Sequence, residues 1–270
     1  MGRFLGQHFL RDFNIRDKII AAAQIAPEDR VLEIGPGQGV ITEQLLLRTP
    51  TVTAVELDRN LAQKLRAWPR LRLIEGDILE LDLNAVLSGG GESSPLPPRS
   101  WKVVANLPYY ITSPILEKLL CCSGDYLDYI VVMIQKEVAE RIVCLAQRQT
   151  SSLSYFISYY ADVEYLFTVK PGCFAPPPKV DSAVIKLTMR RRPPVSAPPN
   201  DLFAVIRTAF RERRKTLRRS LLKLPHSLTA SQWEQVWQQA EIDPQRRPET
   251  LTLEEFSRLT ESIILRSALH

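Results

Sequence analysis

Residues 31–39 read Val-Leu-Glu-Ile-Gly-Pro-Gly-Gln-Gly, an apolar run that ends in a glycine-rich turn. The run predicts a buried strand over Val31–Ile34, and a helix follows from about Gly39 to Leu47. Glycines permit a tight turn and let backbone N–H groups approach a ligand at the N-terminus of the following helix. This stretch therefore predicts the nucleotide-binding turn of a doubly wound α/β fold.

The same alternation continues on the C-terminal side of this turn. Short apolar strands alternating with helices of about ten residues are typical of a parallel sheet with helices on both faces. Further strands are predicted over Val52–Val55, Leu71–Ile74, Val103–Ala105, Ile130–Ile134, Phe167–Val169 and Val184–Leu187, with helices near Asn60–Ala67 and Lys136–Ala146. The last two strands are compatible with a hairpin around Pro176–Pro178, and residues 88–100 are rich in glycine and proline, which predicts a surface loop.

Carboxylates stand at successive strand ends. Glu56 ends the second strand, where an acidic side chain accepts hydrogen bonds from ribose hydroxyls in doubly wound folds. Asp77 ends the third strand and is placed to accept from an adenine amino group. The alternative for Glu56 taken alone is a solvated carboxylate, but acceptors or turns at consecutive strand ends favour a binding site.

The glycine turn does not match the dinucleotide pattern, because Thr42 stands where the third glycine is required. Glu33, directly before the turn, suits a cationic ligand better than a pyrophosphate. Both an amino-acid ammonium and a sulfonium meet that requirement.

Asn106-Leu107-Pro108-Tyr109 follows the fourth strand. An exocyclic adenine N6 is a poor nucleophile because its lone pair is delocalised into the ring. The Asn106 side-chain oxygen and the Leu107 carbonyl can accept both N6 hydrogens, which favours a more pyramidal nitrogen. Pro108 stiffens the turn, and Tyr109 offers a face for the adenine. The alternative is a turn that merely ends the strand.

Phe174-Ala175-Pro176-Pro177-Pro178-Lys179-Val180-Asp181-Ser182 forms a second cluster. We expect its prolines to present Phe174 to the other face of the target adenine, while Lys179 reaches a phosphate. The alternative is a proline-rich hairpin with Phe174 in the core.

Positive charge is concentrated in the last third of the chain. Residues 186–270 hold 16 Lys and Arg against 9 Asp and Glu, whereas residues 1–185 hold 19 against 21. The segment 190–200 reads as an exposed linker between residues 1–190 and a helical domain over 191–270. Helices are predicted at Leu202–Leu224, Gln232–Ala240 and Leu253–Leu265, and the first carries half of these 16 basic residues. This distribution predicts a polyanionic partner, for which nucleic acid is the first candidate. The alternative is a helix face that is merely exposed to solvent.

Other classes of protein are disfavoured. No apolar run approaches the roughly 18–20 residues that cross a bilayer, and the chain starts without a signal-like apolar region, so we expect a cytoplasmic protein. We expect no metal site, because the cysteine and histidine residues are scattered and lack Cys-x-x-Cys spacing. They are Cys121, Cys122, Cys144, Cys173, His8, His226 and His270.

Taken together, these motifs resemble the small-subunit ribosomal RNA adenine dimethyltransferases of the KsgA/RsmA type over nearly the whole chain. The segments that carry the resemblance are Gly6–Leu10, Glu33–Gly39, Glu56–Asp58, Gly76–Asp77, Asn106–Tyr109 with Ile111 and Pro114, Gln135–Ala139, Phe174–Ser182, Arg213–Leu217 and Arg247–Glu249.

The resemblance implies a Rossmann-like S-adenosylmethionine-dependent methyltransferase sheet (residues 1–190) with a small all-α, basic RNA-binding domain (residues 191–270). It implies transfer of four methyl groups to two adjacent adenosines near the 3′ end of small-subunit RNA in an immature subunit, by a protein that we expect to be a monomer. Cofactor contacts are implied or predicted at His8, Leu10, Gly35, Gly37, Glu56, Asp77 and Asn106. RNA contacts are predicted at Lys179, Arg211, Arg213, Arg214, Lys215 and Arg218.

Two rivals remain at this point. A large-subunit RNA adenine methyltransferase of the antibiotic-resistance type shares the core motifs, but Arg213–Leu217 and Arg247–Glu249 favour the small-subunit reading. A non-catalytic assembly factor with a vestigial cofactor site is the other, and the intact strand-end acceptors argue against it. His8 stands where Asn is frequent in the family, so its cofactor contact is expected to differ in detail.

Overall fold

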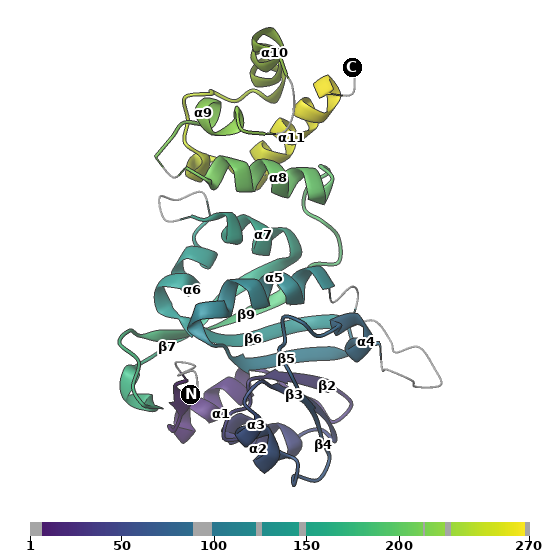
Figure 1. Ribbon diagram of the computed structural model, residues 1–270, viewed down its shortest axis with the longest axis vertical. Helices are drawn as coiled ribbons and strands as arrows, with labels where there is room; N and C mark the ends of the chain where they lie inside the picture. The colour runs from purple at the N-terminus through teal and green to yellow at the C-terminus, as the bar shows by residue number, and fades with distance from the viewer. Residues whose placement is uncertain are drawn as a thin grey trace. The chain divides into compact units, whose positions relative to one another are not determined.

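The computed structural model describes residues 7–88, 99–122, 126–145, 150–212, 214–224 and 228–267. The chain forms two compact units (Figure 1). One comprises Met1–Glu140 with Ala161–Met189, and the other comprises Arg141–Tyr160 with Arg190–His270.

A seven-stranded sheet forms the centre of the first unit, in the order β4-β3-β2-β5-β6-β9-β7. Strands β2 to β6 are all parallel, β9 is antiparallel to β6, and β7 is antiparallel to β9. The predicted parallel sheet and the antiparallel pairing of the last two strands are confirmed. The bounds are β2 Arg30–Ile34, β3 Thr51–Glu56, β4 Leu71–Glu75, β5 Trp101–Asn106, β6 Leu127–Gln135, β7 Ala161–Val169 and β9 Ser182–Met189.

Helices cover both faces of this sheet. Figure 1 shows α1 (Phe13–Ala22), α2 (Val40–Leu46) and α3 (Arg59–Leu65) on one face, and α4 (Leu83–Leu87) and α5 (Thr112–Cys122) on the other. Side-chain oxygens of aspartates cap the first N–H groups of α1, α3 and α4, so the sequence itself sets where these helices begin. Helix α6 (Lys136–Val143) follows β6 directly. The central strands β2 and β5 are almost fully buried, as expected for a sheet covered twice.

Two features of this unit differ from the sequence-based expectation. Strand β7 begins at Ala161 rather than at Phe167. In its first half the exposed charged residues Asp162 and Glu164 alternate with less exposed residues, a pattern that an edge strand tolerates. A separate two-stranded antiparallel sheet joins β1 (Phe9–Leu10) to β8 (Phe174–Ala175), a pairing between residues about 165 positions apart that no local pattern announces.

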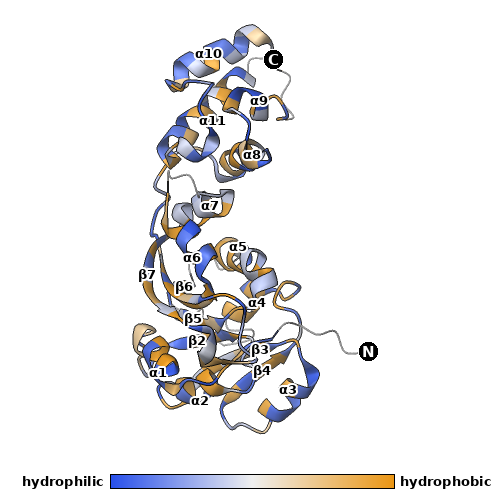
Figure 2. Cartoon of the chain, turned by 90° about the vertical axis from the view of Figure 1, so that its left-hand side faces the viewer, coloured by the Kyte–Doolittle hydropathy of each residue, from blue (hydrophilic) through white to orange (hydrophobic). Residues whose placement is uncertain are grey.

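The second unit is helical: α7 (Ser152–Tyr160), α8 (Pro199–Phe210), α9 (Leu217–Leu221), α10 (Ala230–Ala240) and α11 (Leu253–Ser267). Figure 2 shows hydrophilic and hydrophobic residues on each of α8, α10 and α11. Tyr155 on α7 packs its ring against Phe210 and Phe256, and its hydroxyl donates to the Leu251 carbonyl at 2.5 Å. This buried contact places 141–160 in the second unit, whereas the sequence had suggested a division at 190.

The prediction of one long helix over Leu202–Leu224 is wrong, because the structure has two helices there, α8 and α9, with a non-helical segment between them. The Leu217 N–H donates to the Arg246 carbonyl at 2.9 Å and the Arg218 N–H to the Pro244 carbonyl at 3.0 Å. The first N–H groups of α9 therefore have carbonyl partners from a distant part of the chain. They do not need the carbonyls of a preceding helical turn, so α9 begins as a separate helix. Leu222, which directly follows α9, is 65% exposed.

None of the helices in the described part of the chain is both long and apolar enough to cross a membrane.

Candidate active site

A pocket opens at the carboxyl edge of the parallel strands, and residues after β2, β3, β4 and β5 line it together with β1. Most of the site residues predicted from the sequence line this pocket: His8, Leu10, Gly35, Gly37, Glu56, Asp77, Asn106, Leu107, Pro108 and Tyr109.

The glycine turn between β2 and α2 depends on backbone conformations that favour glycine. Gly35, Gly37 and Gly39 have φ values of +66°, +59° and +83°. Glu56 ties this turn to β3, since its Oε2 accepts from the Gly37 N–H at 3.0 Å and its Oε1 accepts from the Asp58 N–H at 2.9 Å. The carboxylate is thereby held against the turn, with remaining lone pairs for a ligand hydroxyl.

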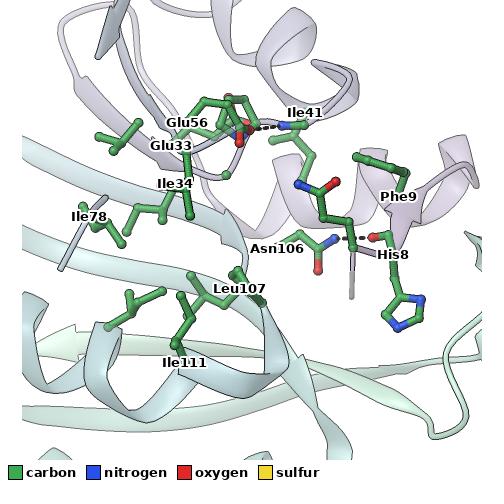
Figure 3. A pocket seen from close by; sticks show the side chains of 18 of the residues that line it. His8, Phe9, Glu33, Ile34, Ile41, Glu56, Ile78, Asn106, Leu107 and Ile111 are labelled. Carbon is green, nitrogen blue, oxygen red and sulfur yellow. Dashed lines mark hydrogen bonds between the residues drawn. The ribbon is translucent and has the colours of Figure 1, made fainter. Parts of the chain in front are cut away.

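Glu33 and Glu56 lie side by side in the wall of the pocket (Figure 3). Both are buried, at 2% and 3% exposure. Burial raises the pKa of Glu33 to about 8, Thr42 opposes this shift, and the negative charge of Glu56 adds to it. Two adjoining buried carboxyl groups make this wall suited to a cation.

The Asn106 amide has a defined orientation. Its Nδ2 donates to the backbone carbonyl of His8 in the loop before β1, at 3.1 Å (Figure 3). This bond leaves Oδ1 as the amide atom that can accept a hydrogen bond in the pocket. The next residue is anchored too, since the Leu107 N–H donates to the Met133 carbonyl at 3.0 Å and the Leu107 side chain is buried.

Tyr109 is held at its phenol and at its ring. Its hydroxyl is 2.6 Å from Ser182 Oγ, at the start of β9, and its ring centroid is 5.7 Å from that of His8. Burial raises the pKa of Tyr109, so the phenol stays neutral at physiological pH. A neutral, fixed aromatic ring in the pocket wall is suited to stacking on a flat heterocycle.

The imidazole of His8 turns away from the Asn106 amide (Figure 3). Its Nδ1 bonds to the Pro176 carbonyl at 2.7 Å, which links the loop before β1 to the proline-rich segment. Because this nitrogen is occupied, the cofactor contact predicted at His8 is available to its backbone and to the rest of its ring.

Phe174 does not line the pocket. Pairing of β8 with β1 buries its ring, at 4% exposure, in a core cluster that includes Leu10 and Val184. The stacking surface expected from Phe174 is therefore not formed in this structure, and the alternative of a core residue describes its position.

The described residues that are predicted to contact RNA are not among those that line the pocket. Lys179 is exposed in the first unit, and Arg211, Arg214, Lys215 and Arg218 are exposed in the second. Arg218 forms an ion pair with Glu234 at 2.7 Å. Arg213 lies outside the described residues. The described residues contain no group of His, Cys, Asp and Glu able to hold a metal ion.

Sequence reasoning missed several apolar lining residues, among them Phe9, Leu57 and Ile78. Leu57 and Ile78 each follow a strand-end carboxylate, and this position was the available signal. Phe9 had none, because it reaches the site through β1: its ring lies where a Cβ on Gly37 would approach it to 3.1 Å.

Gly39→Ala should destabilise the glycine turn. A Cβ there would lie 2.5 Å from the Trp68 ring, and the positive φ adds backbone strain. We expect the free energy of unfolding, measured by urea denaturation, to fall by about 2–4 kcal/mol. Gly172→Ala is the control, because its Cβ would meet nothing within 4 Å. Equal stability of the two variants would contradict this account.

Comparison with known proteins shows the family of this chain. The model of the ribosomal RNA adenine dimethylase family matches residues 2–260. Ribosomal RNA small subunit methyltransferase A of Clostridium botulinum is 41% identical over 96% of this chain and 92% of its own length, and that of Bacillus pumilus is 42% identical over 98% and 91%.

Two solved structures are similar along nearly the whole chain. A dimethyladenosine transferase from Plasmodium falciparum has a TM-score of 0.77 at 25% identity, covering 96% of this chain and 98% of its own. The 23S rRNA methyltransferase ErmE has a TM-score of 0.66 at 25% identity, covering 95% and 99%. The extent of the family match and the identity to these relatives show that the chain belongs to the ribosomal RNA adenine dimethylase family.

Proposed function

We propose that this protein uses S-adenosylmethionine to dimethylate N6 of two adjacent adenosines in a loop near the 3′ end of small-subunit (16S) ribosomal RNA during ribosome biogenesis. The observation that carries the proposal is the orientation of Asn106, whose amide nitrogen is engaged by the His8 carbonyl so that its oxygen is available in the pocket. The relatives at about 40% identity, named for small-subunit RNA methylation, support the choice of substrate.

The pocket fits the cofactor in four places. The turn at Gly35 and Gly37 admits close approach of a ligand to the backbone, and the fixed Glu56 carboxylate can accept from ribose hydroxyls. Asp77 lies at the next strand end, where an adenine amino group can donate to it. Among the described residues the buried Glu33 Oε2 has no hydrogen-bond partner, which suits this wall to a cationic or donating group.

S-adenosylmethionine supplies a methyl group on a sulfonium, an excellent leaving group, so the protein has no need of a strong base. Asn106 Oδ1 and the Leu107 carbonyl accept hydrogen bonds from the two N6 hydrogens of the target adenine, which orients the amine. Tyr109, fixed by Ser182, provides the stacking face. Orientation of this kind is worth roughly 7–11 kcal/mol of the barrier.

The large-subunit rival shares this geometry, since ErmE has a similar fold over nearly the whole chain. Identity separates the two readings: the relatives named for the small subunit are 40–42% identical, against 25% for ErmE. The small-subunit substrate is therefore the one that we propose.

The basic residues of the second unit supply the RNA contacts in this proposal. Arg211, Arg214 and Lys215 are exposed in the segment between α8 and α9 of the second unit, and Lys179 is exposed in the first unit. Arginine and lysine on phosphates contribute affinity that falls with salt. The target adenines belong in a loop, because an A-form helix hides the base edges. Residues 1–190 would thus carry catalysis and 191–270 RNA binding.

A cytoplasmic location and a monomeric state are parts of the proposal. Cell fractionation and light scattering on the purified protein test them.

The reaction is tested with methyl-labelled S-adenosylmethionine and three separate substrates: naked small-subunit RNA, immature small subunits and large-subunit RNA. We expect dimethyladenosine, identified by mass, in small-subunit RNA within immature subunits. Label confined to large-subunit RNA would support the rival enzyme. RNA binding without any transfer would leave only a non-catalytic assembly factor.

Asn106→Asp tests the orienting bond. Aspartate keeps an acceptor oxygen but lacks the N–H that donates to the His8 carbonyl, so the acceptor is no longer oriented. We expect the single-turnover rate at saturating substrates to fall about 100-fold, the loss typical of a misplaced catalytic group. Asn84→Asp, the same change at an exposed position on α4, should retain the rate of the unsubstituted protein. An unchanged rate in Asn106→Asp would refute the orienting role.

The basic segment is tested through salt dependence. Removing two phosphate contacts should lower the slope of log affinity against log salt concentration by about two. We expect this for Arg214→Ala combined with Lys215→Ala, measured by RNA binding at several salt concentrations. Lys64→Ala, an exposed lysine on α3, should leave the slope unchanged. A double variant with the original slope would place the RNA contacts elsewhere.

A further inference from the structure

We propose that Glu33, which the proposed function already places in the wall facing the cationic part of the cofactor, changes from a neutral carboxylic acid to a carboxylate as the cofactor binds, so that binding releases a proton. This inference rests on the cofactor named in the proposed function. Glu33 takes no part in orienting the target amine, and this inference gives it a role in sensing the charge of the ligand.

The surroundings of Glu33 favour the neutral acid in the free protein. Its register partners on the neighbouring strands, Ala54 on β3 and Val104 on β5, are both 0% exposed and apolar. Glu33 Oε2 is buried without a hydrogen-bond partner among the described residues, and the buried Thr42 hydroxyl of α2, which lowers the pKa of Glu33, offsets the effect of burial only in part. A buried carboxylate with an unpartnered oxygen is disfavoured relative to the protonated form.

The charges around Glu33 act in the same direction. Glu56 on β3 faces it and is held in place by hydrogen bonds from two backbone N–H groups, and its charge raises the pKa of Glu33. The other titratable side chains that line the pocket are His8, Asp77, Tyr109 and Tyr110. In the described part of the chain Glu33 forms no salt bridge, so no cation offsets its ionisation. Burial and Glu56 together raise the pKa of Glu33 to about 8.

A cation bound beside Glu33 reverses this balance, because an opposite charge favours the carboxylate. S-adenosylmethionine carries two cations, an ammonium and a sulfonium. S-adenosylhomocysteine keeps the ammonium alone, and 5′-methylthioadenosine carries neither. The three ligands share the adenosine portion, so they separate recognition of the nucleoside from recognition of the charge.

Proton release is measured by titration calorimetry on the whole protein without RNA, at about pH 6.5, in buffers of different ionisation enthalpy. We expect close to one proton released for each S-adenosylmethionine bound and none for 5′-methylthioadenosine. Release with S-adenosylhomocysteine as well would identify the ammonium as the partner, and release with S-adenosylmethionine alone would identify the sulfonium. No release with either charged ligand would overturn the proposal.

The affinity should depend on pH in the same sense. Below the pKa of free Glu33 the proton must be removed before the carboxylate can form, so each unit of falling pH weakens binding up to about tenfold. We expect this weakening between about pH 7.5 and 6.5 for S-adenosylmethionine, and no change for 5′-methylthioadenosine.

Glu33→Gln, an uncharged isostere, should release no proton and bind S-adenosylmethionine with an affinity independent of pH over this range. Glu43→Gln, an exposed glutamate on α2, is the matched control and should behave as the unsubstituted protein does. Retained affinity of Glu33→Gln for 5′-methylthioadenosine shows that its pocket is folded. Should that variant not fold, the pH series and the three ligands on the unsubstituted protein still decide the question.

The outcomes also separate this inference from the proposed function. Failure of S-adenosylmethionine to bind at all would remove the cofactor and with it the proposed reaction. Binding with the same proton release in Glu33→Gln, or with none in the unsubstituted protein, would remove only the role of Glu33.

Discussion

The parallel, in-register pairing of β4, β3, β2 and β5 is the constraint on which the site depends. Parallel strands direct their carboxyl ends to one edge, so residues far apart in the chain converge there. The pairing of Ile34 with Val55 and with Ala105 aligns the residues that come next, among them Glu56 and Asn106. A shift in register of one residue would turn these side chains to the other face of the sheet.

The electrostatics of the pocket follow from this convergence. Two strand-end carboxyl groups meet in a wall that excludes water, and each responds differently. Glu56 accepts hydrogen bonds from two backbone N–H groups, whereas Glu33 has an oxygen with no hydrogen-bond partner among the described residues. Glu56 is thus positioned to accept hydrogen bonds from ligand hydroxyl groups, and Glu33 is arranged to respond to the charge of the ligand. Such pairs with diverging environments are typical of functional sites.

The N-terminal segment completes what the sheet begins. His8 contributes a carbonyl to the Asn106 amide and a ring nitrogen to the Pro176 carbonyl, and Phe9 covers Gly37. Three parts of the chain that are distant in sequence are therefore linked by two consecutive residues. The β1–β8 pairing that holds them also buries Phe174, so one interaction both positions the catalytic turn and removes a predicted stacking side chain.

Local chemistry was enough to predict the parallel strands of the central sheet and the glycine turn with the carboxylates that follow it, because these depend on hydrophobic periodicity and on residues adjacent in the chain. The tertiary structure alone decided the rest. The position of Phe174 depends on a strand pair formed across the chain, and the break between α8 and α9 depends on carbonyls supplied by residues 244 and 246. The orientation of the Asn106 amide and the proton affinity of Glu33 are likewise set by groups from other elements, since hydrogen bonding and burial act through space and not along the sequence.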